Sequence, residues 1–278
     1  MSWHGRLELR YTRDGERTVA HDRHHGPLRV LQRLYPEGDR VCHHVLVHPP
    51  GGIVGGDRLE IDAQLDAGTH VLITTPGATR FYRSAEATAS QSVRLRVADG
   101  ARLEWLPLET IAFPGCRAEN RLVIELEPSA EMIGWDMLAL GLPAAGAAFE
   151  AGGGSFRQHL ELPGRWLERG TIDARDERLL DSPLGFARQR VLATMWFASG
   201  SPLLPSAEQR LLDAAREVAG ASPLAPHIGV TAPQDGIVVL RALASRVEPA
   251  MALLSAVRGR WRELSWSLDA GVPRVWRT

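Results

Sequence analysis

Short runs of alternating apolar and polar residues fill the chain from its N-terminus to about Asp173, and Gly, Pro, Asp or Asn closes each run. A period of two is typical of strands that bury one face, so this region is predicted to be rich in β-structure. The runs recur about every 10 to 15 residues, which leaves little room for crossover helices and argues against a Rossmann-type sheet. The predicted strands include Leu7–Tyr11, Leu28–Val30, Val45–Val47, Leu59–Ile61, Val71–Ile73, Val93–Val97, Leu103–Trp105, Leu122–Leu126 and Trp166–Glu168.

The apolar period changes to that of a helix in two later segments. Ser206 stands where an N-cap would, and Gln209 follows three residues on, which predicts a capping box that opens a helix ending near Gly220. The second predicted helix runs from about Pro249 to Leu264, with apolar residues at helical spacing. The expected fold is therefore mainly β, a β-helical or layered arrangement of many strands with two C-terminal helices.

The domain organisation follows from the lack of a convincing linker. Three successive glycines at 152–154 form a segment too short to separate domains. We therefore predict a single domain over residues 1–278, β-rich over 1–200 and mixed β/α over 201–278.

Composition narrows the class of protein. In 278 residues, 44% are hydrophobic, which is enough for a large core, and the net charge of −1 offers no field to attract nucleic acid or an anionic membrane. The two cysteines, Cys42 and Cys116, form no metal-binding or disulfide pattern. The charged start of the chain and the absence of a long apolar run predict neither a signal peptide nor a membrane span, so we expect a cytoplasmic protein without nucleic-acid or membrane partners.

Two glycine pairs flank Ile53 and Val54 in the segment GGIVGGD at 51–57. A phosphate-binding loop needs Lys and then Ser or Thr after its last glycine, yet here Asp57 and Arg58 follow, and a carboxylate would repel phosphate. The residues after Asp57 alternate as a strand, whereas a dinucleotide fingerprint opens a helix. The sequence of this loop therefore argues against nucleotide binding.

Histidines crowd the first fifty residues and suggest a metal site, because imidazole is a common metal ligand. The neighbours His43 and His44 point to opposite faces of a strand, so the spacing does not assemble a closed site. Ser84 lacks the surroundings of a nucleophile elbow. The crowded histidines are His21, His24, His25, His43, His44 and His48.

Three acidic residues stand in unusual surroundings. Asp57 ends the glycine loop, Asp136 interrupts an apolar run, and Glu168 lies beside bulky residues. An ionised carboxylate in an apolar setting must be paired, hydrogen-bonded or hydrated. Each acid is thus either a structural anchor or part of a hydrated internal path. Together with Glu104 and Glu109, these acids also leave open an acid/base pair for a hydrolase or lyase.

Four blocks in a fixed order carry a family resemblance: HPPGGIVGGD at 48–57, LITTPGATRFYRS at 72–84, LEWLPLETIAFPG at 103–115 and GWDMLALG at 134–141. These blocks closely resemble the urease accessory protein UreD family, called UreH in some bacteria. The resemblance is strong from about residue 28 to 170 and looser through the final helices. Four long motifs in order are far more specific than a single glycine pattern.

The resemblance implies a chaperone and not an enzyme. UreD-like proteins join UreF and the GTPase UreG and dock on the urease apoprotein (UreA, UreB and UreC), so that nickel reaches the urease active site. The resemblance also implies a β-helical fold of many strands and a 2:2:2 complex with UreF and UreG. The GTP site belongs to UreG, in agreement with the missing phosphate loop.

A water-filled tunnel for nickel has been proposed in this family. By motif, the tunnel residues correspond to Asp57, Asp136 and Glu168, with Thr79 as a wall residue. The expected cofactor set is therefore no tightly bound group and Ni²⁺ in transit. Carboxylate oxygens spaced along water would hold a divalent ion weakly enough to release it. A purely structural adaptor without metal transit is the alternative.

One departure from the family pattern concerns Leu142 and Ala147, which stand where relatives often carry Arg and Glu. The joint loss of both charges is expected if the two residues are partners. At the C-terminus, Trp261, Trp266 and Trp276 are candidates for the UreF contact, although the helical spacing of Trp261 favours a place in the core.

Overall fold

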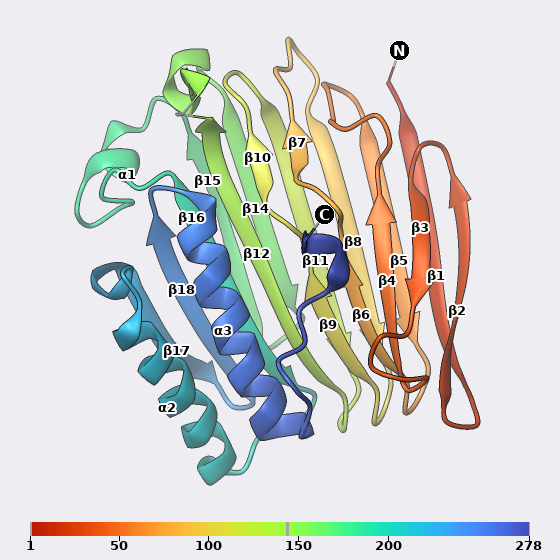
Figure 1. Cartoon of the computed structure of the whole chain (residues 1–278). Coiled ribbons are helices and arrows are strands. Elements are labelled where there is room, and N and C mark those ends of the chain that lie inside the picture. The colour runs from red at the N-terminus through yellow and green to blue at the C-terminus, as the bar shows by residue number, and fades with distance from the viewer. Residues whose placement is uncertain (1, 143–144, 278) are drawn as a thin grey trace.

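Two large β-sheets lie face to face in the computed structural model, which describes residues 2–142 and 145–277 (Figure 1). In spatial order the first sheet contains seven described strands: β15 (Trp166–Asp173), β14 (Ser155–Leu162), β11 (Arg117–Leu126), β8 (Ala89–Val97), β5 (Arg58–Leu65), β1 (His4–Asp14) and β2 (Arg17–His25). The second sheet follows the order β17 (Ile228–Gln234), β18 (Ile237–Ala244), β16 (Val191–Ser199), β12 (Glu131–Leu142), β9 (Arg102–Leu106), β6 (His70–Thr74), β4 (Val41–Val47) and β3 (Arg29–Leu34), with the short strands β7 (Thr79–Phe81), β10 (Thr110–Ala112) and β13 (Ala147–Ala148) beside this path.

The chain winds as a β-solenoid between the two sheets. After β4 it alternates, with β5, β8, β11 and β14 in the first sheet and β6, β9 and β12 in the second. Neighbours within each of these sets pair in parallel. This arrangement confirms the predicted mainly β, β-helical fold. Parallel strands need long connections, and here the opposite sheet supplies them in place of crossover helices.

Strand β12 shows how the alternation of side chains builds two cores. Leu138 and Leu140 pack between the sheets, whereas Trp135 and Met137 pack on the other face against the helices. Because β12 is buried on both faces, its sequence is an almost continuous apolar run, and the alternation rule therefore did not predict it. The same reason applies to β16, which is also buried along most of its length.

Helices α2 (Pro205–Ala221) and α3 (Val247–Trp266) cover part of the second sheet, and both predicted helices are confirmed (Figure 1). The predicted capping box is wrong. The N-cap of α2 is Leu204, which makes no side-chain cap, and Pro205 occupies the first turn because its fixed φ suits that position. A short helix, α1 (Glu177–Asp181), was not predicted; the 3₁₀ segments are η2 (Phe149–Gly152), η3 (Ala225–His227) and η4 (Arg274–Arg277).

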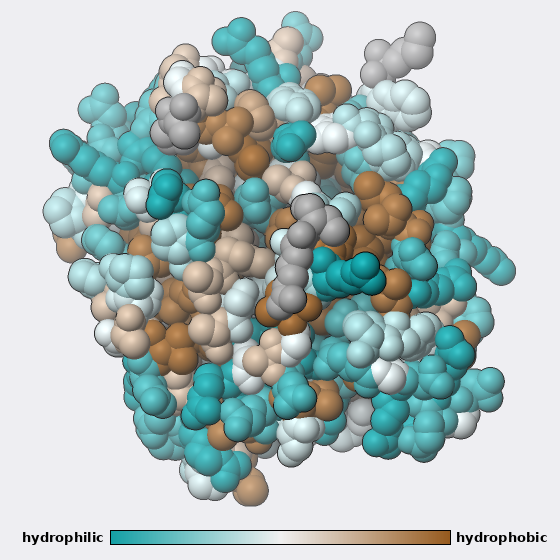
Figure 2. Space-filling model, in the orientation of Figure 1, coloured by the Kyte–Doolittle hydropathy of each residue, from teal (hydrophilic) through white to brown (hydrophobic). Residues whose placement is uncertain are grey.

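Polar and apolar residues intermingle on the face that carries the helices, and apolar residues gather beside the C-terminal segment where the helices leave the sheet uncovered (Figure 2). Within residues 2–142 and 145–277, no helix has the length and apolar character needed to span a membrane.

Candidate functional site

A row of polar side chains lies in the largely apolar space between the two sheets. Asn120 on β11 and Gln158 on β14 occupy paired, inward-facing positions, and both donate hydrogen bonds to Asp136 Oδ2 on β12, over 3.2 Å and 2.5 Å. Gln91 on β8 extends the row by donating to Asn120 Oδ1 over 3.3 Å. We call Gln91, Asn120, Gln158 and Asp136 the polar row. It joins the two sheets through side chains that the alternation of the strands turns inward.

The pKa of Asp136 is raised to about 6, because burial disfavours the charged carboxylate more than the hydrogen bond from Gln158 favours it. Near neutral pH the carboxylate is mostly ionised and can attract a cation. Gln158 Oε1 is buried and has no hydrogen-bond partner in the described part of the chain, so it offers a second free oxygen beside the same carboxylate.

Glu168 shares a cavity with Asp136. This cavity, the Glu168 cavity, has a volume of about 290 Å³ and is lined by Asp136, Gln158, Glu168 and Thr194 among mostly apolar side chains. Glu168 on β15 forms an ion pair with Arg241 on β18. Two of the three predicted acids, Asp136 and Glu168, are thus brought to one cavity, together with uncharged oxygens that suit a hard or borderline cation.

Thr79 lies at a second cavity at the other end of the polar row. This Thr79 cavity has a volume of about 210 Å³, and His48, Gln91 and Trp105 also line it. Burial lowers the pKa of His48, while the charge of Asp57 opposes the shift. Because Gln91 lines the Thr79 cavity and Gln158 lines the Glu168 cavity, the hydrogen-bonded polar row extends from one cavity to the other.

Asp57 lines neither cavity, although its charge acts on His48 of the Thr79 cavity. It is buried, and its two oxygens accept hydrogen bonds from the backbone amides of Trp3 over 2.7 Å and Val54 over 3.1 Å. The glycine loop thus ends in a carboxylate that ties the N-terminal segment to its own turn. In that turn Gly56 has φ of +87°, which other residues rarely adopt. The contacts of Asp57 are those of an anchor, and its place on a metal path stays a prediction.

The crowded histidines make separate local contacts. His44 hydrogen-bonds Tyr11 over 2.7 Å, His43 pairs with Glu37 over 2.7 Å, and His21 contacts Thr12. In the described ranges, no group of three or more His, Cys, Asp or Glu side chains could hold a metal ion. Burial raises the pKa of Cys116 to about 12, so its thiol stays protonated.

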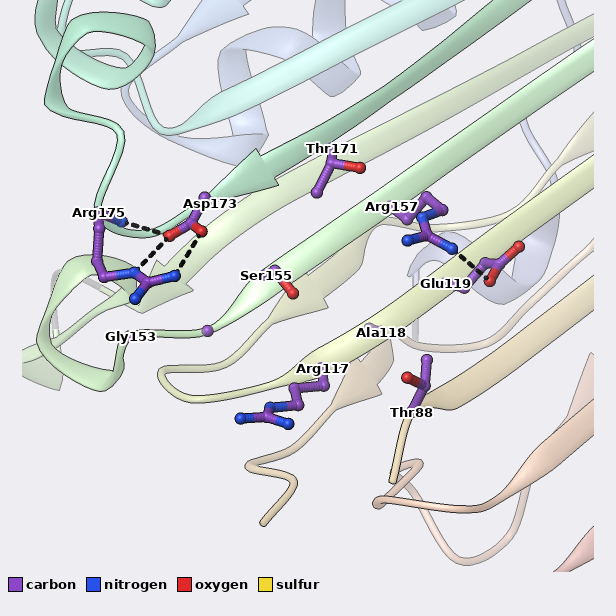
Figure 3. A pocket seen from close by; sticks show the side chains of 11 residues that line it. Thr88, Arg117, Ala118, Glu119, Gly153, Ser155, Arg157, Thr171, Asp173 and Arg175 are labelled. Carbon is purple, nitrogen blue, oxygen red and sulfur yellow. Dashed lines mark hydrogen bonds and ion pairs between the residues drawn. The ribbon is translucent and has the colours of Figure 1, made fainter. Parts of the chain in front are cut away.

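A third cavity lies at the end of the first sheet, near β11, β14 and β15 (Figure 3). Its volume is about 250 Å³, and three guanidinium groups line it. Figure 3 shows that Arg175 is held by Asp173 and Arg157 by Glu119, so acids neutralise two of the three cations. This neutralisation disfavours an anion site.

Two of the three C-terminal tryptophans that were candidates for a partner contact are buried in the core. Trp261 is fully buried and Trp266 is 5% exposed, so both belong to the core between the helices and the second sheet. Trp276 is partly buried and donates from Nε1 to Thr74 Oγ1 over 2.8 Å. The favoured core position of Trp261 is confirmed.

Leu142 and Ala147 are direct partners across the β12–β13 pair. Two charges at these positions would face each other, in agreement with the expectation that they were lost together.

Sequence reasoning missed the amides of the polar row and Arg241. The available signal was polar residues at inward positions of alternating strands, such as Asn120 between Ala118 and Leu122. Their mutual contact depends on which strands become neighbours, and no local pattern encodes that.

Fold and site together define a two-sheet β-solenoid whose interior carries a polar row between two cavities. A family model described as UreD urease accessory protein matches residues 4–277. The chain is 63% identical over 280 residues to the urease accessory protein UreD of Leptothrix cholodnii, with all of both chains covered. Equally complete matches are 57% identical to that of Variovorax paradoxus and 56% identical to that of Methylibium petroleiphilum. The chain therefore belongs to the UreD urease accessory protein family.

Proposed function

We propose that this protein acts in urease maturation as a non-catalytic, cytoplasmic scaffold. It joins UreF and UreG on the urease apoprotein, in a 2:2:2 complex with UreF and UreG. Membership of the urease accessory protein family supports the maturation role. The partners and the stoichiometry rest on the family resemblance of the motifs.

The second part of the proposal is an internal, water-filled route for Ni²⁺ along the polar row. The supporting observation is that hydrogen-bonded side chains extend from the Thr79 cavity to the Glu168 cavity, with Asp136 between the sheets. A small number of carboxylates among neutral amides is enough to attract a divalent ion. It does not form the closed set of ligands that would trap the ion. Nickel is thus cargo, and the protein holds no cofactor of its own.

Urease activation with substituted protein tests the route. Asp136→Asn keeps the size of the side chain and removes its charge, so nickel-dependent activation should fall severalfold while co-elution with UreF and UreG on size-exclusion chromatography is unchanged. Asp14→Asn, which removes an exposed carboxylate, is the matched control. Wild-type activation by Asp136→Asn would remove the route from the proposal.

A purely structural adaptor is the second candidate, and the two amide contacts of Asp57 favour it. In that case Asp57→Ala lowers activation only in proportion to its loss of thermal stability, whereas substitution of a route residue lowers activation without a matching loss of stability. Turnover of a small substrate by the isolated chain, without urease or the other accessory proteins, would instead support a hydrolase or lyase.

A further inference from the structure

The ion pair between Glu168 and Arg241 bridges the two sheets. Glu168 belongs to β15, the edge strand of the first sheet, and Arg241 belongs to β18 in the second. On the second sheet Arg241 pairs in register with Thr194, and Thr194 pairs with Asp136. The guanidinium therefore continues the line of inward positions that begins at Asp136.

Exposure places this ion pair at the mouth of the Glu168 cavity. The Glu168 side chain is 25% exposed and the Arg241 side chain 48% exposed, and Glu168 lies on the edge strand β15. The partners of Asp136 lie on β14 and β11, further from that edge. A cation that enters or leaves on this side therefore meets a Glu168 carboxylate that is already paired with the guanidinium group of Arg241. Arg241 does not itself line the cavity and reaches it through its ion pair with Glu168. Arg169 does line the cavity, and it makes no ion pair in the described part of the chain.

We propose that Arg241 is a tethered counter-cation that gates this mouth of the route. It occupies the Glu168 carboxylate when the route is empty, and a divalent cation must displace it to bind there. The inference rests on the proposed nickel route and adds a residue that determines how tightly the route holds its cargo.

Competition explains why such a gate would suit a delivery protein. Two unpaired carboxylates near one cavity, Asp136 and Glu168, would hold a divalent ion more tightly and release it more slowly. When the metal leaves, the guanidinium group of Arg241 can pair with Glu168 again. Release is then easier, because the carboxylate is not left without a counter-charge. The guanidinium group and the metal ion compete for a single carboxylate, so the expected effect on Ni²⁺ affinity is modest.

Calorimetric titration of the purified, tag-free chain with NiCl₂ tests the gate without any urease. Arg241→Met keeps an apolar stem of similar length and frees Glu168, so Ni²⁺ should bind about fivefold tighter, which equals about 1 kcal/mol. Arg246→Met removes an exposed positive charge five residues further on and should leave the affinity unchanged. Adding Glu168→Gln to Arg241→Met should abolish the gain, because the freed carboxylate is its source.

Distinct results separate failure of the gate from failure of the route. Equal Ni²⁺ affinities of the wild type and Arg241→Met, including undetectable binding by both, would overturn the gate. A gain that survives Glu168→Gln would overturn it too, since it would reflect general charge. Loss of activation in Asp136→Asn, with no change of affinity in Arg241→Met, would keep the route and remove the gate. Thermal unfolding of each variant verifies that it is folded before titration.

Discussion

Arg258 Nε donates a hydrogen bond of 2.5 Å to Glu104 Oε2, across 154 positions of the chain, and both side chains are almost completely removed from water. Arg258 lies on α3 and Glu104 on β9, so the pair holds the C-terminal helix against the second sheet. Arg262, also buried, places Nε 3.2 Å from the other carboxylate oxygen. Burial alone would raise the pKa of Glu104, but the charges of Arg258 and Arg262 and the nearby His70 lower it to about 2.

Glu104→Gln should therefore destabilise the protein strongly. The substitution leaves two buried guanidinium groups without their shared counter-charge, and the expected loss of unfolding free energy is about 3 to 5 kcal/mol. Chemical denaturation monitored by tryptophan fluorescence measures it. Arg260→Ala is the control on the same helix, because the ion pair between Arg260 and Glu263 is exposed and should contribute less than about 1 kcal/mol. Equal losses in the two variants would contradict the anchoring role.

The pKa of Asp136 is shifted in the opposite direction to that of Glu104, and this shift should make the stability of the protein depend on pH. Its folded-state pKa is raised from 3.8 to about 6, so between these values the folded state binds more protons than the unfolded state. The unfolding free energy contributed by this group therefore falls as pH rises through that window, and the penalty is complete above about pH 6. Asp136→Asn removes the cost of burying the charged carboxylate, and this cost exists only at pH values at which Asp136 is ionised.

The expected measurement is a difference between two unfolding curves at several pH values. The stability of Asp136→Asn relative to the wild type should increase by roughly 2 to 3 kcal/mol from about pH 4 to about pH 7. Any constant cost of the new amide beside Gln158 does not affect this slope. A relative stability that stays flat or falls with pH would show that the carboxylate is not desolvated.

Trp261 should be a structural residue and not a docking residue. Its ring is fully buried and meets Phe197 at a centroid distance of 6.3 Å, and its Nε1 donates to the Leu211 carbonyl on α2 over 3.0 Å. Trp261→Ala should cost about 3 to 5 kcal/mol of unfolding free energy. Leu204→Ala, at a residue 74% exposed, should change stability by less than about 0.5 kcal/mol. Impaired UreF binding by Trp261→Ala at wild-type stability would contradict this assignment.

The predictions from sequence succeeded where a strand has one buried and one exposed face, as in β5, where Leu59, Ile61 and Ala63 alternate with polar residues. They failed for β12, because a strand with cores on both sides shows no alternation.

The candidate site divides in the same way. Asp136 could be nominated because a carboxylate in an apolar run needs a partner or water. Its partners Asn120 and Gln158 could not be, and neither could Arg241, which lies 73 positions from Glu168. Each contact exists because the solenoid places particular strands opposite one another.

The neighbouring glycines Gly51 and Gly52 should respond to substitution for different reasons. Gly51 has φ of +77° with open space around it, so Gly51→Ala costs backbone strain alone. At Gly52 a Cβ atom would overlap the ring of Tyr82, so Gly52→Ala should destabilise by about 1 to 3 kcal/mol through that clash. Tyr82→Ala should rescue most of the loss in Gly52→Ala and none of the loss in Gly51→Ala, as a double-mutant cycle by thermal unfolding would measure. Additive effects at Gly52 and Tyr82 would instead mean that the loop moves to accommodate the methyl group, and that close packing against the ring is not why glycine occupies this position.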